Sequence, residues 1–171
     1  MNQLQSAWES HIDLHTDPDG WPFDDEAHQQ AEARRNAEAW AAFEPIALIA
    51  ARLVTSSEQR RPRVPSDVSQ PRWGWQLGVL TAVAHQLDAL SASAEQALSD
   101  LPPGAGPGSD AYGAVIAERN AAAWPRLEEW VLHAPAVVGI RAATAGADRP
   151  LLTTSAPAQP ATVRSSSAVR R

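Results

Sequence analysis

The sequence predicts an all-α protein, an antiparallel bundle of four to five helices with two helices kinked by proline and a disordered C-terminal tail. Three observations support this fold. Apolar residues recur at alternating spacings of four and three, prolines and glycines cluster between the periodic segments, and the chain of 171 residues is long enough for one domain with a real core. We therefore expect helices to bury their apolar stripes against one another.

The clearest helix is predicted from Pro71 to Leu101. Its apolar stripe consists of Trp73, Leu77, Leu80, Ala84, Leu87, Ser91, Ala94, Leu98 and Leu101. No charged residue lies between Trp73 and Leu87, which is typical of a helix surrounded by others. Gly74, Gly78 and Ala82 form a second face of small residues. Either a neighbouring backbone approaches closely there, or the regular helix starts after Gly74.

A second helix is predicted from Asp24 to about Thr55. Asp24 is a good N-cap, and the acidic residues that follow it suit the positive end of the helix dipole. Pro45 interrupts the segment, because proline lacks the N–H that the helix needs at that position. We expect a kink near Phe43–Glu44, or two helices in sequence.

The remaining helices are shorter or less regular. A third segment starts at Ser109, a good cap, and Pro125 is expected to kink or split it. Pro135 should end this segment, and residues 136–145 can form a short last helix. At the start of the chain, the pattern favours a short helix that ends near Thr16.

Two breaks and a tail divide the chain. A linker with three prolines is expected over residues 56–72, and a Pro/Gly-rich loop over residues 101–108. Both lie within one helical domain, residues 1–148. Residues 149–171 carry four arginines and no acid and are rich in Ala, Ser, Thr and Pro, so we expect a disordered basic tail.

One short sequence occurs twice. Residues 35–40 read Arg-Asn-Ala-Glu-Ala-Trp, and residues 119–124 read Arg-Asn-Ala-Ala-Ala-Trp. A proline follows each copy within five positions. In a chain this rich in alanine the match could be accidental, and the alternative is a duplicated helical hairpin.

The histidines are the candidate metal ligands. His11 and His15 are four residues apart, so both project from one helix face, and His28 with a nearby carboxylate could complete a site for one divalent metal ion. His28, His85 and His133 lie on three different helices and could instead converge at the end of a bundle. The alternatives are solvated surface pairs for the first group and a hydrogen-bonded core residue for His85.

Other catalytic motifs are missing. Residues 17–20, Asp-Pro-Asp-Gly, resemble the start of a calcium loop, but three of the later ligand positions fail and turn chemistry explains them better. The paired Glu-x-x-His motifs of a di-iron bundle, a nucleophilic serine motif and a phosphate-binding loop are all absent from the sequence.

The chain has seven tryptophans, two phenylalanines and one tyrosine. Most of the tryptophans fall on helix stripes and should fill the core, whereas Trp8, Trp21 and Trp75 lie off the stripes and are candidates for an interface. Arg119 and Arg126 lie near Trp124 in sequence and could form a pocket for an anion. The alternative is a structural ion pair between Arg119 and Glu44 or Glu118.

Composition limits the function classes. A net charge of −6 argues against broad nucleic-acid binding, except through the basic tail. We find no signal peptide and no apolar run long enough for a membrane span, so we expect a cytoplasmic protein. Cysteine and lysine are absent and alanine occupies 34 positions, which indicates a GC-rich bacterial genome.

Our leading hypothesis for function is a small interaction or regulatory protein without catalytic chemistry, with a protein partner or a second copy as its ligand. The alternative is a small helical enzyme. It would depend on a metal bound by the scattered histidines, or act on a small molecule in a pocket lined by Trp and Arg.

Overall fold

The computed structural model of the chain describes residues 2–147. The five α-helices of this part are α1 (Asn2–His15), α2 (Asp25–Arg60), α3 (Trp73–Ser99), α4 (Asp110–His133) and α5 (Pro135–Ala147), with a 3-10 turn at Arg61–Arg63. The described residues contain no strand beyond one isolated bridge between Thr16 and Pro22. The predicted all-α fold is confirmed.

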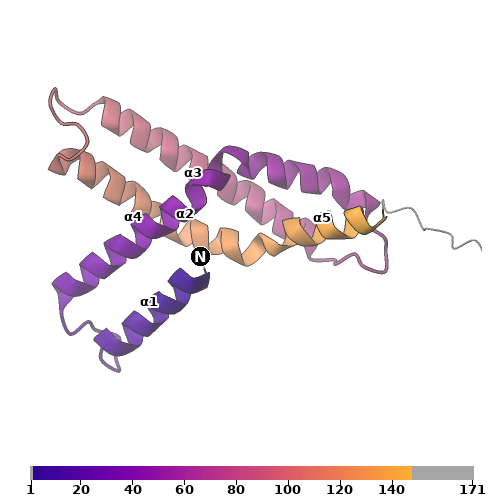
Figure 1. Ribbon diagram of the computed structural model, residues 1–171, viewed down its shortest axis with the longest axis horizontal. Helices are drawn as coiled ribbons and strands as arrows, with labels where there is room; N and C mark the ends of the chain where they lie inside the picture. Colours follow the sequence, from indigo (N-terminus) through magenta and orange to yellow (C-terminus); the bar gives the residue numbers. More distant parts are fainter. Residues whose placement is uncertain (1, 148–171) are drawn as a thin grey trace, which may run out of the picture.

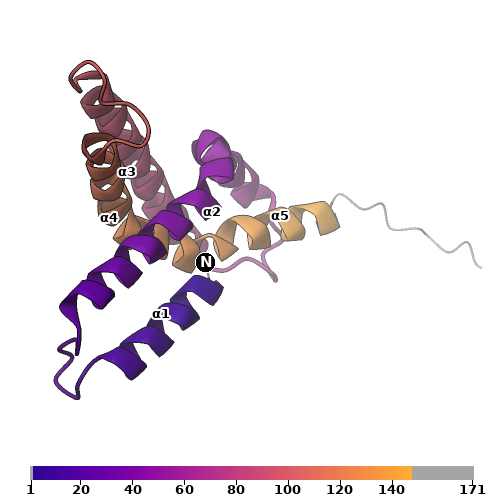
Figure 2. The same ribbon diagram turned by 60° about the vertical axis from the view of Figure 1, so that its left-hand side comes forward.

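Helix α3 forms an antiparallel hairpin with α4, and both pack against α2 (Figure 1). Helix α5 follows α4 directly and contacts α2, α3 and α4. Helix α1 lies alongside the first half of α2, at the edge of the bundle (Figure 2). The molecule therefore consists of a central three-helix core with α5 added at one side and α1 at another.

The core lies where α2, α3 and α4 meet. The predicted stripe of α3 supplies much of it, because Leu77, Leu80 and Leu87 are almost completely buried. Residues from the other helices complete the core: Trp40, Phe43 and Val54 of α2, Leu127 and Trp130 of α4, and Ile140 of α5. Burying one large apolar side chain is worth about 1.5–3 kcal/mol, so this contact between four helices is what stabilises the fold.

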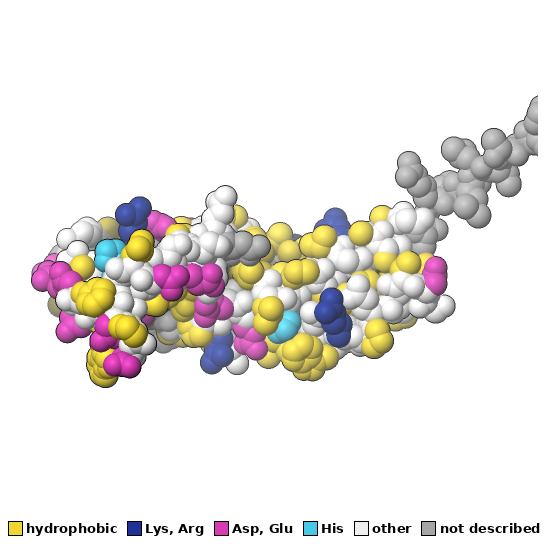
Figure 3. Space-filling model, turned by 90° about the horizontal axis from the view of Figure 1, so that it is seen from below, with side chains coloured by type: hydrophobic (Ala, Val, Ile, Leu, Met, Phe, Trp, Pro, Cys, Tyr) yellow, Lys and Arg dark blue, Asp and Glu magenta, His cyan; other side chains and the backbone are white. Residues whose placement is uncertain are grey.

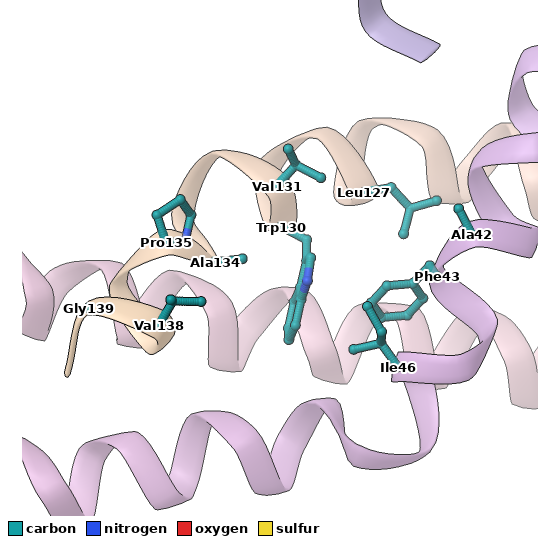
Figure 4. A pocket seen from close by; sticks show the side chains of 10 residues that line it. All are labelled: Ala42, Phe43, Ile46, Leu127, Trp130, Val131, Ala134, Pro135, Val138 and Gly139. Atoms are coloured by element: carbon teal, nitrogen blue, oxygen red, sulfur yellow. The ribbon is translucent and has the colours of Figure 1, made fainter. Parts of the chain in front are cut away.

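Helix α2 continues through Pro45 as one helix of 36 residues. Its axis bends sharply in the middle (Figure 1), and the bend lies beside Phe43 and Ile46 (Figure 4). The missing N–H of Pro45 and the clash of its ring with the preceding turn explain the bend. The predicted kink is confirmed. Helix α4 contains Pro125 without ending there, so of the two predicted outcomes at Pro125 the split is wrong, and the kink stays a prediction.

The boundary predicted for the linker was placed too early. Residues 56–60 are helical, since α2 extends to Arg60. Ser57 is almost completely buried, and its hydroxyl donates to the carbonyl of Leu53 at 2.8 Å, so its polar atom is satisfied within the helix. The predicted tail, residues 149–171, lies outside the described residues.

Side chains cap the helices and close the turns as the sequence predicts. The backbone N–H of Ala27 donates to Asp24 Oδ1 at 3.0 Å at the start of α2, and that of Tyr112 donates to Ser109 Oγ at 3.3 Å at the start of α4. In the turn after α1, Asp17 Oδ1 accepts from the N–H of Asp19 and of Trp21. Gly20 has a φ of +86°, a conformation that favours glycine.

The small-residue face of α3 does not approach another backbone. Gly74 lies inside the helix, and a Cβ there would be 3.2 Å from the guanidinium of Arg61. A Cβ at Gly78 would meet nothing within 4 Å. The prediction that a neighbouring backbone approaches this face is therefore wrong. The alternative prediction, that the regular helix starts after Gly74, is also wrong, because α3 begins at Trp73.

One stretch is long and apolar enough to cross a membrane by length and composition alone. It runs from Asp25 to Arg63 and includes an 18-residue window with a mean hydropathy of 1.2, of which 28% is buried. The core helix of a soluble protein passes the same test. Cytoplasmic localisation stays a prediction.

Candidate binding sites

The two copies of the repeated sequence meet across the interface between α2 and α4. The guanidinium of Arg35 lies 4.2 Å from the centre of the Trp124 ring, and that of Arg119 lies 4.3 Å from the centre of the Trp40 ring. Each arginine thus stacks on the tryptophan of the other copy. Such an exchange is what an internal two-fold relation between α2 and α4 would produce.

Each arginine also makes the same local contact. Arg35 donates through Nε and Nη2 to the side-chain oxygen of Asn36, at 3.0 and 2.8 Å. Arg119 makes the equivalent pair of bonds to Asn120, at 3.2 and 2.9 Å. The asparagine fixes the plane of the guanidinium, and the ring of the opposite helix covers its face. We call these six residues the Arg–Asn–Trp clamp: Arg35, Asn36, Trp40, Arg119, Asn120 and Trp124.

The two halves of the clamp differ in burial. Arg35 is 8% exposed because Trp8 of α1 covers its second face, with the guanidinium 4.0 Å from the ring centre. Its carboxylate partner is Glu32, at 3.2 Å. Burial lowers the pKa of both arginines, but nearby carboxylates, Glu32 for Arg35 and Glu44 for Arg119, act in the opposite direction. Both side chains therefore serve as packed cations.

The predicted anion pocket is not assembled. Arg119 contacts Trp40, whereas Trp124 contacts Arg35, so the two do not share a cavity wall as predicted. Arg126 lies 3.9 Å from Glu129 in an ion pair. Closeness in sequence was a poor guide to contact here, because Arg119 and Trp124 are five residues apart and do not face each other on a helix. Each tryptophan instead contacts an arginine of the other helix.

Three of the five histidines come together, as the first metal hypothesis required. The ring centres of His11 and His15 are 4.5 Å apart, and those of His11 and His28 are 5.7 Å apart. Trp8 stacks on His11 at 5.4 Å. His11 Nε2 and His28 Nδ1 are buried without a hydrogen-bond partner among the described residues. We call Trp8, His11, His15 and His28 the histidine cluster.

Within residues 2–147, no group of three or more His, Asp or Glu side chains has a geometry that could hold a metal ion, and metal binding by the histidine cluster stays a prediction. Burial, with the adjoining His15 and His28 rings, lowers the pKa of His11. The rings of Trp8 and His11 lie against that of His28, so the cluster forms part of the contact between α1 and α2.

The other two histidines do not converge with His28. His133 is buried, and its ring lies edge-on to Trp75 at 4.9 Å. His85 is exposed on α3. The alternative prediction, that His85 is a hydrogen-bonded core residue, is wrong, because Ala84 and Leu87 take the buried positions instead.

An apolar groove lies at the corner between α4 and α5, facing the bend of α2. It has a volume of about 650 Å³. None of its lining residues is ionisable: Ala42, Phe43, Ile46, Leu127, Trp130, Val131, Ala134, Pro135, Val138 and Gly139. Figure 4 shows the side chains of Phe43 and Ile46 on one wall and those of Pro135 and Val138 on the other, with Trp130 between them. The sequence placed Trp130 on a core stripe but gave no sign of a groove beside it.

A second hollow, of about 580 Å³, lies between α2, α3 and α4 and is polar. Arg119 and Trp40 of the clamp line it, together with the carboxylates of Glu44, Asp88 and Glu95. Its chemistry differs from that of the groove, because it offers three acids, one cation and an aromatic ring. A smaller hollow of about 280 Å³ between α1 and α2 also combines these residue types, because Trp8, Arg34 and Arg35 line it.

Comparison with known protein families, with characterised proteins and with solved structures finds no match to this chain.

Proposed function

We propose that this chain is an interaction protein without catalytic chemistry, and that its binding surface is the apolar groove between α2, α4 and α5. The observation that supports this proposal is the lining of the groove. A volume of about 650 Å³ falls in the range of ligand sites, yet no side chain in it can transfer a proton, attack a substrate or bind a metal. Such a surface can bind apolar groups and do little else.

We infer that the occupant is a second copy of this chain. The lining contains both a hollow, beside Trp130, and a protruding side chain, Val138, which is 68% exposed. In a symmetric dimer the same patch of each chain meets its copy, so that patch must contain both a hollow and the protruding side chain that fills it. Two chains of net charge −6 repel each other, and the lining of the groove adds no further charge to that repulsion.

The experiment is a comparison of molar mass by size exclusion with light scattering. Val138→Glu puts a carboxylate in each groove, and its exposed position means that the monomer fold tolerates the change. We expect the variant to dissociate into monomers at concentrations where the original chain is dimeric. The cost of desolvating an unpaired charge in the interface makes the loss at least about tenfold in affinity.

Leu14→Glu is the matched control. Leu14 is 73% exposed, like Val138, but lies on α1, away from the groove. This variant should remain dimeric. Equal dissociation of both variants would mean that net charge alone governs association, and an unchanged mass for Val138→Glu would rule out the groove as the interface.

A second candidate function is binding of a small molecule in the polar hollow. Arg119, Trp40 and the carboxylates of Glu44, Asp88 and Glu95 favour a ligand that carries an amine and a flat or apolar part. A thermal-shift screen with primary amines and amino acids tests this function, with Asp88→Asn as the variant that should lose the response. A screen in which no compound raises the melting temperature would argue against it.

A further inference from the structure

Three large apolar side chains at the end of α1 and in the turn before α2 are exposed in the described structure. Leu14 is 73% exposed, Trp21 is 72% exposed and Phe23 is 71% exposed. Soluble proteins seldom expose three such residues so close together unless the patch binds something. We call these three residues the aromatic tip.

The aromatic tip is held in place by its backbone. The N–H of Asp17 donates to the carbonyl of Trp21 at 2.8 Å, and the N–H of Phe23 donates to the carbonyl of His15 at 2.9 Å. These bonds flank the bridge between Thr16 and Pro22. Trp21 and Phe23 flank Pro22, and both side chains are exposed. The backbone that carries them is thus held by hydrogen bonds within the turn.

The surroundings of the aromatic tip are strongly acidic. Residues 13–26 contain six carboxylates and no arginine: Asp13, Asp17, Asp19, Asp24, Asp25 and Glu26. Figure 3 shows acidic side chains gathered toward one end of the molecule, with apolar side chains among them. A ligand for this surface must therefore combine positive charge with apolar groups. Arginine satisfies both demands, because its guanidinium stacks on aromatic rings and pairs with carboxylates.

We propose that the aromatic tip binds residues 149–171 of this same chain. This segment carries Arg149, Arg164, Arg170 and Arg171 and has no acid, which makes it the complement of the tip in charge. Its distal part pairs apolar side chains with cations, because Val163 precedes Arg164 and Val169 precedes Arg170. The proposal goes beyond the groove and does not depend on it.

The segment is long enough to reach. Helix α5 ends at the side of the molecule opposite the turn between α1 and α2 (Figure 1). A returning chain would pass the 13 residues of α5, about 20 Å, and the part of α2 before Pro45, about 30 Å. The stretch from Arg149 to Arg164 spans up to about 53 Å when extended, so Arg164, Arg170 and Arg171 are the cations that can reach the aromatic tip.

The experiment uses a fluorescently labelled peptide of residues 149–171 and the full-length chain with its four tail arginines replaced by serine. We expect the peptide to bind this neutralised chain saturably, as measured by anisotropy, and to bind less well as salt is raised. Adding Trp21→Ser and Phe23→Ser should weaken binding at least about tenfold. Trp75→Ser, which removes a 64% exposed tryptophan elsewhere, is the control and should leave binding unchanged.

The unaltered chain supplies the decisive comparison. Its own tail competes for the tip at a high effective concentration, so the peptide should bind it at least about tenfold more weakly than it binds the neutralised chain. Equal binding to the two chains would overturn the proposal, as would a peptide that does not bind the neutralised chain or that binds equally without Trp21 and Phe23.

Discussion

At the scale of single residues, the contacts that fix this molecule are made by polar groups packed among aromatic rings. Arg35 lies between Trp8 and Trp124, and His11 lies against Trp8 with two further imidazoles beside it. Both side chains are partly removed from water. Neighbouring groups therefore influence the protonation of each side chain and supply the contacts that water would otherwise make. Substituting them should therefore affect stability more than substituting residues on the surface.

The two arginines of the clamp provide a matched pair. Replacing Arg35 with methionine removes stacking on two rings and leaves the oxygen of Asn36 without its donors. We expect it to reduce the free energy of unfolding by about 2–3 kcal/mol. Arg119→Met removes stacking on one ring in a less buried place and should cost about 1 kcal/mol. Urea unfolding measures the free energy of unfolding of both variants. A larger loss for Arg119→Met than for Arg35→Met would contradict the greater structural role given to Arg35.

The histidine cluster makes stability depend on pH. Burial lowers the pKa of His11 below its ordinary value of 6.5, so the unfolded chain binds its proton more tightly than the folded chain. The stabilising contribution is fully present above pH 6.5 and is lost as the pH falls from 6.5 toward the lowered pKa. We expect an NMR titration of the imidazole to show a midpoint below 6.5 for His11. His11→Phe, which keeps the stacking on Trp8, should weaken the acid destabilisation.

At the scale of elements, helix packing predicts that two helical glycines respond differently to substitution by alanine. A Cβ at Gly139 of α5 would lie 3.0 Å from the buried ring of Trp73, whereas a Cβ at Gly78 of α3 would meet nothing. Gly78→Ala should therefore stabilise the protein by about 0.5–1 kcal/mol through helix propensity. Gly139→Ala should destabilise it, because the crowding exceeds that gain. Thermal unfolding of the two variants side by side tests the packing of α5 on α3.

The sequence predicted the elements well because their determinants are local. The caps at Asp24 and Ser109, the kink at Pro45 and the buried stripe of α3 each follow from a few neighbouring residues. The extent of α2 was missed, since the burial of Ser57 depends on tertiary packing that no local pattern shows.

The sites were harder to predict than the helices. The approach of His11, His15 and His28 was foreseen because a short turn joins the two helices that carry them. The partners of Trp124 and Arg119 were not, because they depend on the register of α2 against α4. The groove was missed for the same reason, since it exists only where the corner between α4 and α5 faces the bend of α2.

At the scale of the whole molecule, the two proposed binding surfaces differ in charge. The groove, at the other end of α2's first half, is lined without an ionisable side chain, whereas the exposed side chains of the aromatic tip lie among six carboxylates in sequence. We therefore propose self-association at the groove, whose lining adds no charge to a chain of net charge −6, and recognition of the basic segment at the aromatic tip.

Sedimentation equilibrium of the unaltered protein shows whether two copies of the chain pair at all, as the proposed function of the groove requires. Between about 1 and 100 µM, we expect a mass that approaches about 37 kDa, twice the 18.3 kDa of one chain. A mass that stays at 18.3 kDa over this whole range would rule out a dimer formed through the groove.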